Sequence, residues 1–212
     1  YNIAVSSVMA PPGGGPGCNV ASTDKAERDF SIQLIKDVID MGHQWGCKRL
    51  AFVAGWHRFG ISHAAARRNT LDALKVLGEH ALDRDVVICI EATATDSNIV
   101  DTPDDAIELI EMAGLPNIGV MFDMQHAFFR KDDPTDYVYT SGKYLKSVHL
   151  TDYDRLTPGA GSADFYPVMQ ALKDIGYDGF VTMETGFSRT SGMRSITKKA
   201  IDFLRAIEET LI

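Results

Sequence analysis

The sequence lacks several features that mark common classes of protein. No apolar run approaches the roughly 18 residues that a membrane-spanning helix needs, and no basic-then-apolar leader precedes Tyr1. Cysteine is scarce, and Cys18, Cys47 and Cys89 have neither metal-ligand nor redox spacing, which suits a reducing compartment. We therefore expect a protein with no membrane association and a cytoplasmic location.

Positive charge and phosphate-binding loops are also lacking. Lys and Arg number 21 against 29 Asp and Glu, so the net charge is −8, the wrong sign for binding a nucleic acid backbone. The chain has no GxxxxGK[ST] and no complete GxGxxG. Gly159-Ala160-Gly161 lacks the third glycine, and the PPGGGPG segment at 11–17 lacks the lysine of a phosphate loop. We expect no nucleic acid partner, and we interpret both segments as ordinary loops.

What the chain does have is a regular alternation of apolar strands with amphipathic helices. Its 212 residues, 45% hydrophobic and 24% charged, suffice for one well-packed domain. A typical helix is Lys25–Met41, which Asp24 and Glu27 begin with a capping-box pattern. The alternation predicts a parallel sheet with helices outside, and both an open doubly wound sheet and a closed (β/α)8 barrel satisfy it. The predicted strands are Asn2–Val8, Arg49–Ala54, Val86–Ala92, Ile118–Asp123, Ser147–Thr151 and Phe180–Glu184.

Four potential metal ligands lie at or near the carboxyl ends of four consecutive predicted strands: Glu91, Asp123, His149 and Glu184. Their intervals of 32, 26 and 35 residues each match one strand plus one helix, so we expect them to converge at one mouth. Singly, such residues are often helix caps or core histidines. Together, three carboxylates would repel one another without a cation. Oxygen-rich ligation with one imidazole suits Mn²⁺, Mg²⁺ or Co²⁺.

Four strings, FDMQH, VHLTDYDR, GAGSADF and VTMETGF, together with Glu91, resemble the xylose-isomerase-like TIM-barrel superfamily of sugar isomerases and epimerases. The branch that they resemble most is that of the D-tagatose and ketose 3-epimerases. The resemblance runs from about Asp24 to Glu184 and implies a (β/α)8 TIM barrel, as one domain over residues 1–212. Only six strands are predicted, so we expect a barrel without its first strand–helix unit, incomplete at the N-terminus, and without part of the last.

The same resemblance implies roles for individual residues. It makes Glu91, Asp123, His149 and Glu184 the ligands of a divalent ion, manganese by preference, with Glu91 and Glu184 doubling as acid and base. His126 and Arg155 would contact substrate oxygens, and Trp56 and Phe128 would form apolar walls. Alternatives exist for these last four: Arg155 pairing with Asp152 or Asp154, His126 merely beginning a loop, and both aromatic residues packing in the core.

The implied reaction is epimerisation at C3 of a ketose sugar. A divalent ion stabilises an enediolate while one glutamate removes the C3 proton and the other returns a proton to the opposite face. The implied partners are a small-molecule sugar and, if the barrel is incomplete, further copies of the chain that cover its exposed sheet edges. The same metal site would also serve an inosose dehydratase or a hydroxy-keto acid isomerase. An abasic-site endonuclease and a sugar-binding remnant without turnover are further alternatives.

Overall fold

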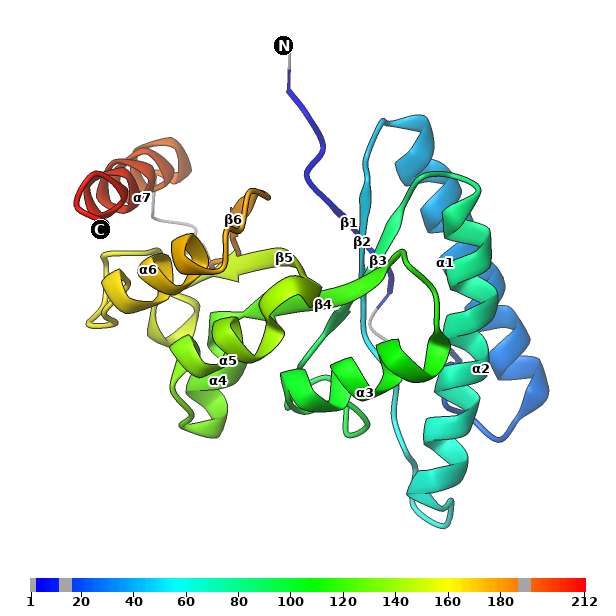
Figure 1. Ribbon diagram of the computed structural model, residues 1–212. Coiled ribbons are helices and arrows are strands. Elements are labelled where there is room, and N and C mark those ends of the chain that lie inside the picture. Colours follow the sequence, from blue (N-terminus) through cyan, green and yellow to red (C-terminus); the bar gives the residue numbers. More distant parts are fainter. Residues whose placement is uncertain (1–2, 12–16, 187–191) are drawn as a thin grey trace. The chain divides into compact units, whose positions relative to one another are not determined.

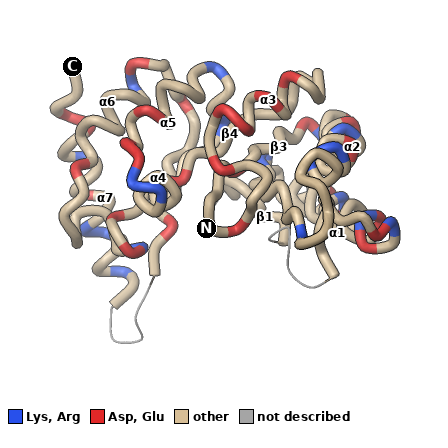
Figure 2. The backbone as a smooth tube through the Cα atoms, turned by 90° about the horizontal axis from the view of Figure 1, so that it is seen from below, with Lys and Arg blue, Asp and Glu red and all other residues tan. Residues whose placement is uncertain are grey.

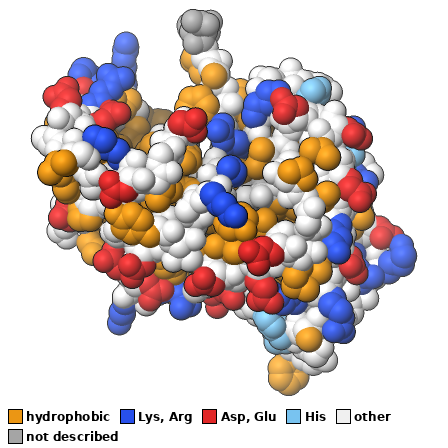
Figure 3. Space-filling model, in the orientation of Figure 1, with side chains coloured by type: hydrophobic (Ala, Val, Ile, Leu, Met, Phe, Trp, Pro, Cys, Tyr) orange, Lys and Arg blue, Asp and Glu red, His pale blue; other side chains and the backbone are white. Residues whose placement is uncertain are grey.

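The computed structural model describes residues 3–11, 17–186 and 192–212, and the chain divides into two compact units, residues 1–121 and 122–212 (Figure 1). Most of the PPGGGPG segment lies outside the described residues. Within the described ranges, no helix is both long and apolar enough to cross a membrane. Acidic and basic residues are interspersed along the backbone and on the face that the space-filling view shows (Figures 2 and 3).

The first unit alternates strands with helices, and its strands pair in parallel in the order of the chain. Helices α1 and α2 lie side by side against these strands (Figure 1). Strand β4 ends in the second unit. The elements are β1 (Val8–Met9), α1 (Lys25–Gln44), β2 (Arg49–Phe52), α2 (His63–Leu82), β3 (Val87–Glu91), α3 (Pro103–Ala113) and β4 (Ile118–Asp123).

Both faces of β2, β3 and β4 are mostly buried, as a parallel sheet requires, whereas Met9 of β1 is exposed. One face carries large aliphatic and aromatic side chains, and these are buried together with apolar residues of the helices: Leu50, Phe52, Ile88, Ile90, Ile35, Ile39, Leu74 and Leu77. On the other face Ala51, Cys89 and Met121 form a small cluster, against which Val87 packs. Because strand side chains alternate, Glu91 continues the face of Val87 and Cys89.

The second unit contains β5 paired in parallel with β6, so that His149 lies opposite Thr182. Its core gathers apolar side chains of nearly every element, including Phe122, Leu150, Phe165 and Leu172, and the α7 residues Phe203 and Leu204 pack against it. The elements are α4 (Met124–Arg130), α5 (Pro134–Ser141), the 3-10 turns η1 (Gly142–Tyr144) and η2 (Tyr153–Arg155), β5 (Leu145–Leu150), α6 (Tyr166–Asp174), β6 (Val181–Met183) and α7 (Met193–Glu208).

The boundaries at the start of the chain differ from the predicted ones. Pairing in β1 begins only at Val8, which lies opposite Leu50, so most of the predicted Asn2–Val8 strand has no partner strand among the described residues. Helix α1 continues past Met41 through Gly42, where any Cβ would lie 2.9 Å from Val8 Cγ2. The predicted capping box is wrong, because Glu27 binds Arg58 and only Asp24 caps the helix.

One acidic group of the second unit predicts a pH-dependent stability. Asp132 accepts hydrogen bonds from Arg130 Nε at 2.8 Å and Tyr137 Oη at 2.9 Å, and these bonds, that of Arg130 first, lower the pKa of Asp132. The stabilisation is therefore present above the unfolded pKa of about 4 and lost as the pH falls through the folded pKa. Because Asp132 is accessible to solvent, Asp132→Asn should cost less than about 1 kcal/mol. Denaturant unfolding at pH 7 and pH 3 measures this, and an equal cost at both pH values would contradict it.

Candidate active site

Three of the predicted ligands come together in the second unit, where β4, β5 and β6 end. Asp123 is the last residue of β4, His149 precedes the last residue of β5, and Glu184 directly follows β6. One ligand atom from each of the three lies within 4.8 Å of the others. His149 Nδ1 lies 2.6 Å from Glu184 Oε2. The convergence of strand ends, predicted from spacing, is thus present for these three residues.

Asp123 has two functions in this cluster, one for each carboxylate oxygen. Oδ1 caps α4 by accepting a hydrogen bond from the Gln125 N–H at 2.9 Å. Oδ2 accepts a hydrogen bond from Arg155 Nη1 at 2.6 Å. The side chain is fully buried, so its charge needs partners of this kind. The cap fixes the carboxylate in position, and the arginine compensates its charge.

Glu184 is held in its ionised form by its neighbours. The hydrogen bond with His149 is the main cause that lowers the pKa of Glu184 to about 2; partial burial opposes this shift. The positive charge of Arg155, whose Nη2 lies 3.6 Å from Glu184 Oε1, adds to the lowering. A carboxylate that is kept ionised in this way can bind a cation.

The donor set fits a divalent metal ion. Two carboxylates and one imidazole are the ligand types that Mn²⁺, Mg²⁺ and Co²⁺ accept. His149 Nε2 is buried, and of the side chains in the described ranges only it and Asn117 Oδ1 have a buried polar atom without a hydrogen-bond partner. A buried orphan nitrogen costs stability unless something binds it. The cluster therefore suits a cation better than it suits a purely structural role.

Arg155 reaches the cluster from a strained turn. Asp154 and Arg155 have φ of 57° and 59°, a left-handed conformation that residues other than glycine rarely adopt. Gln125 Oε1 accepts the Arg155 N–H at 3.3 Å, and the Gly186 N–H donates to the Arg155 carbonyl at 2.8 Å. These two bonds hold the backbone from both sides. Arg155 therefore forms ion pairs with Asp123 and Glu184, and not with its acidic neighbours in sequence.

Asp152 organises the loop that carries Arg155, and no sequence motif indicated this role. Its buried carboxylate accepts three backbone N–H groups: Tyr153 at 2.9 Å and Ala163 at 3.0 Å on Oδ1, and Gly161 at 2.9 Å on Oδ2. The last of these explains part of the glycine motif at 159–161. The Gly161 N–H donates to the Asp152 carboxylate and not to a phosphate. This agrees with the interpretation of the motif as an ordinary loop.

The close contact of Gly161 with Asp152 yields a second stability prediction. A Cβ at Gly161 would overlap the Asp152 carboxylate. We expect Gly161→Ala to cost about 1–3 kcal/mol of unfolding free energy, because the loop must move away from its buried acceptor. Gly186→Ala is the matched control, since its Cβ would meet Arg155 O at an ordinary 3.8 Å. Thermal denaturation of both variants measures the difference, and equal melting temperatures would contradict it.

The other predicted substrate contacts of the second unit lie on α4. His126 is buried, with Nε2 3.9 Å from Asp123 Oδ2, so it belongs to the cluster. Phe128 stacks on Tyr153, with ring centroids 4.1 Å apart and planes tilted by 31°. This places an aromatic pair beside the turn that carries Arg155.

Glu91 and Trp56 belong to the first unit. Glu91 ends β3, is buried and lies opposite Met121 in the β3–β4 register. Trp56 follows β2 by four residues and is half-buried. Glu91 thus ends a strand, where the spacing predicts it, and Trp56 comes after the carboxyl end of β2.

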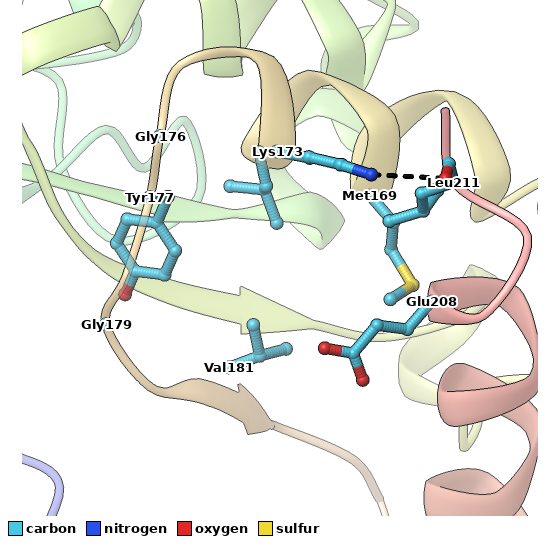
Figure 4. Close-up of a pocket in the computed structure, with 9 residues that line it drawn as sticks. Met169, Lys173, Gly176, Tyr177, Gly179, Val181, Glu208 and Leu211 are labelled. Atoms are coloured by element: carbon cyan, nitrogen blue, oxygen red, sulfur yellow. Dashed lines mark hydrogen bonds between the residues drawn. The ribbon is translucent and has the colours of Figure 1, made fainter.

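A cavity of about 510 Å³ in the second unit is not this site. It lies among α6, the turn before β6, β6 itself and α7 (Figure 4). Its lining is mostly apolar, and Lys173 Nζ turns to the carbonyl of Leu211 at 3.1 Å. None of the predicted site residues lines it. Ligand sites for sugars need convergent polar groups, and the Asp123 cluster supplies them.

The comparison with known protein families decides the classification. A family model described as xylose isomerase-like TIM barrel matches residues 1–207. The chain belongs to this family. The predicted TIM-barrel fold class is thereby confirmed, and so is the superfamily that the four strings indicated.

Several curated relatives of this chain are sugar epimerases. It is 30% identical over 119 residues to D-psicose 3-epimerase of Enterocloster bolteae, a match that covers 56% of this chain and 40% of that protein. It is 26% identical over 171 residues to L-ribulose 3-epimerase of Methylomonas, which covers 79% of this chain and 60% of that protein. Across four curated ketose 3-epimerases, the match spans 36 to 43% of the relative's own length.

Solved structures agree on the fold. A D-tagatose 3-epimerase-like protein superposes with a TM-score of 0.85 at 23% identity, covering 99% of this chain and 80% of that one. A 3-keto-D-glucoside 4-epimerase from E. coli has a TM-score of 0.85 at 20% identity, with 96% and 80% covered. Likeness at these identities extends the family's TIM-barrel architecture to nearly the whole chain.

Proposed function

We propose that the chain catalyses epimerisation at C3 of a free ketose sugar and that it depends on a divalent metal ion. The observation that carries this proposal is the convergence of Asp123, His149 and Glu184, with ligand atoms within 4.8 Å, under the guanidinium of Arg155. The names of the curated relatives, D-psicose and L-ribulose 3-epimerase, support the reaction class. The proposal treats residues 1–212 as one TIM-barrel domain.

In this proposal Asp123, His149 and Glu184 hold the ion, and Glu91 is the fourth ligand. Support for Glu91 comes from the strands: Cys89 and Met121 pack together, and Glu91 and Asp123 each follow one of these residues by two positions. When bound, a divalent ion stabilises negative charge on the substrate oxygens beside the carbon that loses its proton. Manganese is the expected metal.

The proton transfer itself falls to two glutamates. Glu184 and Glu91 act on opposite faces of C3, one removing the proton and the other delivering one, which inverts the centre. The low pKa of Glu184 keeps this carboxylate ionised, the form that the proton-accepting role requires. Arg155 and His126 bind substrate oxygens and orient the sugar, and Trp56 packs against its carbons. The cytoplasmic location and the association with further copies of the chain stay predictions.

A solvent-exchange experiment tests the reaction class directly. The chain is incubated with Mn²⁺ and a panel of ketoses in deuterated water, and the recovered sugars are analysed by NMR. We expect deuterium at C3 together with the C3 epimer, because the returned proton comes from a group that exchanges with solvent.

Other products would point to other members of the superfamily. A conjugated product that absorbs in the ultraviolet would indicate elimination, as in an inosose dehydratase. Deuterium at a different carbon would indicate an isomerase. Either result, or the absence of exchange in every ketose despite bound metal, would overturn the proposed epimerisation.

A further inference from the structure

The backbone that follows β2 is held by side chains from elsewhere in the first unit. The Ala54 carbonyl accepts Thr70 Oγ1 at 2.9 Å, and the Gly55 carbonyl accepts Ser97 Oγ at 2.8 Å. Such groups would otherwise need a neighbouring strand or water. The backbone carbonyls just after β2 therefore remain hydrogen-bonded, although they no longer pair with a neighbouring strand.

Two asparagines continue this pattern with a pair of bonds each. Asn19 Oδ1 accepts the Trp56 N–H at 3.0 Å, and Asn19 Nδ2 donates to the Trp56 carbonyl at 2.9 Å. Asn98 binds His57 in the same way, at 2.7 Å to its N–H and 3.0 Å to its carbonyl. A side-chain amide that binds both backbone groups of one residue fixes its position and its rotation together.

The fit around these asparagines is tight. Gly55 has a φ of +89°, and a Cβ there would lie 2.5 Å from Asn19 Oδ1. Asn19 is itself fully buried, and its N–H donates to Ser31 Oγ at 2.8 Å. At the end of the segment that follows His57, Arg58 makes two bonds to Glu27, at 2.6 and 3.1 Å. Trp56 thus lies in a segment pinned on both sides, which is unusual for a loop.

We propose that Asn19 and Asn98 are positioning residues that hold Trp56 as the apolar wall of the sugar site, so that ketose affinity depends on both amides. This inference rests on the proposed function. A Trp56 side chain that is already fixed need not be ordered when the sugar binds. Binding therefore loses no free energy to this ordering. A displacement of the wall weakens substrate binding, while the ion and the glutamates, which the asparagines do not touch, keep their chemistry.

Tryptophan fluorescence makes the positioning measurable without turnover. The chain has two tryptophans, and Trp45→Phe leaves Trp56 as the only one. In this background Asn98→Ala is the first variant, because Asn98 is half-buried and its loss is compatible with folding, whereas Asn19→Ala empties a fully buried position. We expect acrylamide quenching of Trp56 to rise by about twofold or more in Asn98→Ala. With ketose, KM should rise about tenfold and kcat change by less than about twofold.

Asn69→Ala is the matched control. Asn69 also makes two hydrogen bonds to backbone, to the carbonyls of Ala21 at 3.3 Å and Ser22 at 2.9 Å, but none to residues 54–58. A merely structural role of such asparagines would destabilise both variants and change Trp56 quenching and KM equally. We expect the loss of stability in both variants and the change in quenching and KM in Asn98→Ala alone.

The outcomes separate the inference from the proposed function. Equal quenching in Asn98→Ala and Asn69→Ala would overturn the positioning of Trp56. A rise in quenching with an unchanged KM would overturn the role of Trp56 in ketose binding. If the parent chain exchanges no ketose proton, the proposed function fails, and the quenching comparison by itself still decides whether the asparagines position Trp56.

Discussion

Glu184→Gln is expected to lower kcat for ketose epimerisation by at least about a thousandfold. Glutamine cannot carry the proton that Glu184 exchanges with C3, and it offers the metal a weaker ligand. It retains an oxygen that can accept the hydrogen bond of His149 Nδ1, which lies at 2.6 Å in the parent. The fold should therefore survive, with the unfolding free energy within about 1 kcal/mol of the parent.

The control for this variant is Glu209→Gln, which removes a glutamate charge from the exposed end of α7. Steady-state kinetics and denaturant unfolding of both proteins give the comparison. Glu209→Gln should retain full activity. A Glu184→Gln protein that keeps more than a few per cent of kcat would show that another group moves the proton.

Removal of the metal has the second large expected effect. Dialysis against a chelator should abolish activity, and Mn²⁺ should restore it, because the proposed reaction needs the ion to stabilise negative charge on the substrate oxygens. In the same way, Asp123→Asn should weaken Mn²⁺ binding by at least about a hundredfold, measured by calorimetry on the metal-free chain. Asparagine caps helices about as well as aspartate, so α4 should remain intact.

Asp133→Asn is the matched control for this second prediction. Asp133 caps α5 by accepting the Thr135 N–H at 2.9 Å, as Asp123 caps α4 through Gln125 at the same distance. Both variants thus replace a capping aspartate with a capping asparagine, and only one belongs to the cluster. Equal Mn²⁺ affinities in the two variants would show that Asp123 is a cap and not a ligand.

The strands and their carboxyl ends follow from short-range patterns, so the sequence predicts them well. Apolar alternation places β4 at Ile118–Asp123, and this is the strand that the structure shows. The predicted strand Asn2–Val8 shortens to Val8–Met9 because pairing depends on where β2 lies, which no local pattern encodes. Four polar residues at strand ends were sufficient to predict the cluster of Asp123, His149 and Glu184.

The residues that position the site were beyond sequence reasoning. Asn19 and Asn98 bind backbone that is 37 and 41 residues away along the chain, and asparagine in a loop has no spacing signature of its own. Asp152 looked like a partner for Arg155, yet its carboxylate binds three N–H groups of the backbone. The left-handed turn at Asp154 and Arg155 carries no glycine that would have indicated it. Hydrogen bonds between residues far apart in the sequence hold the asparagines, the Asp152 carboxylate and this turn in place, and such bonds are visible only in the folded chain.

Anomalous diffraction from crystals of the Mn²⁺-loaded chain tests the proposed metal centre most directly. One peak is predicted, with Asp123, His149, Glu184 and Glu91 each placing a nitrogen or oxygen within about 2.0–2.3 Å of it. A peak elsewhere in the chain, or one that Glu91 does not reach, would contradict the proposed four-residue metal centre, in which Glu91 and Glu184 also transfer the protons.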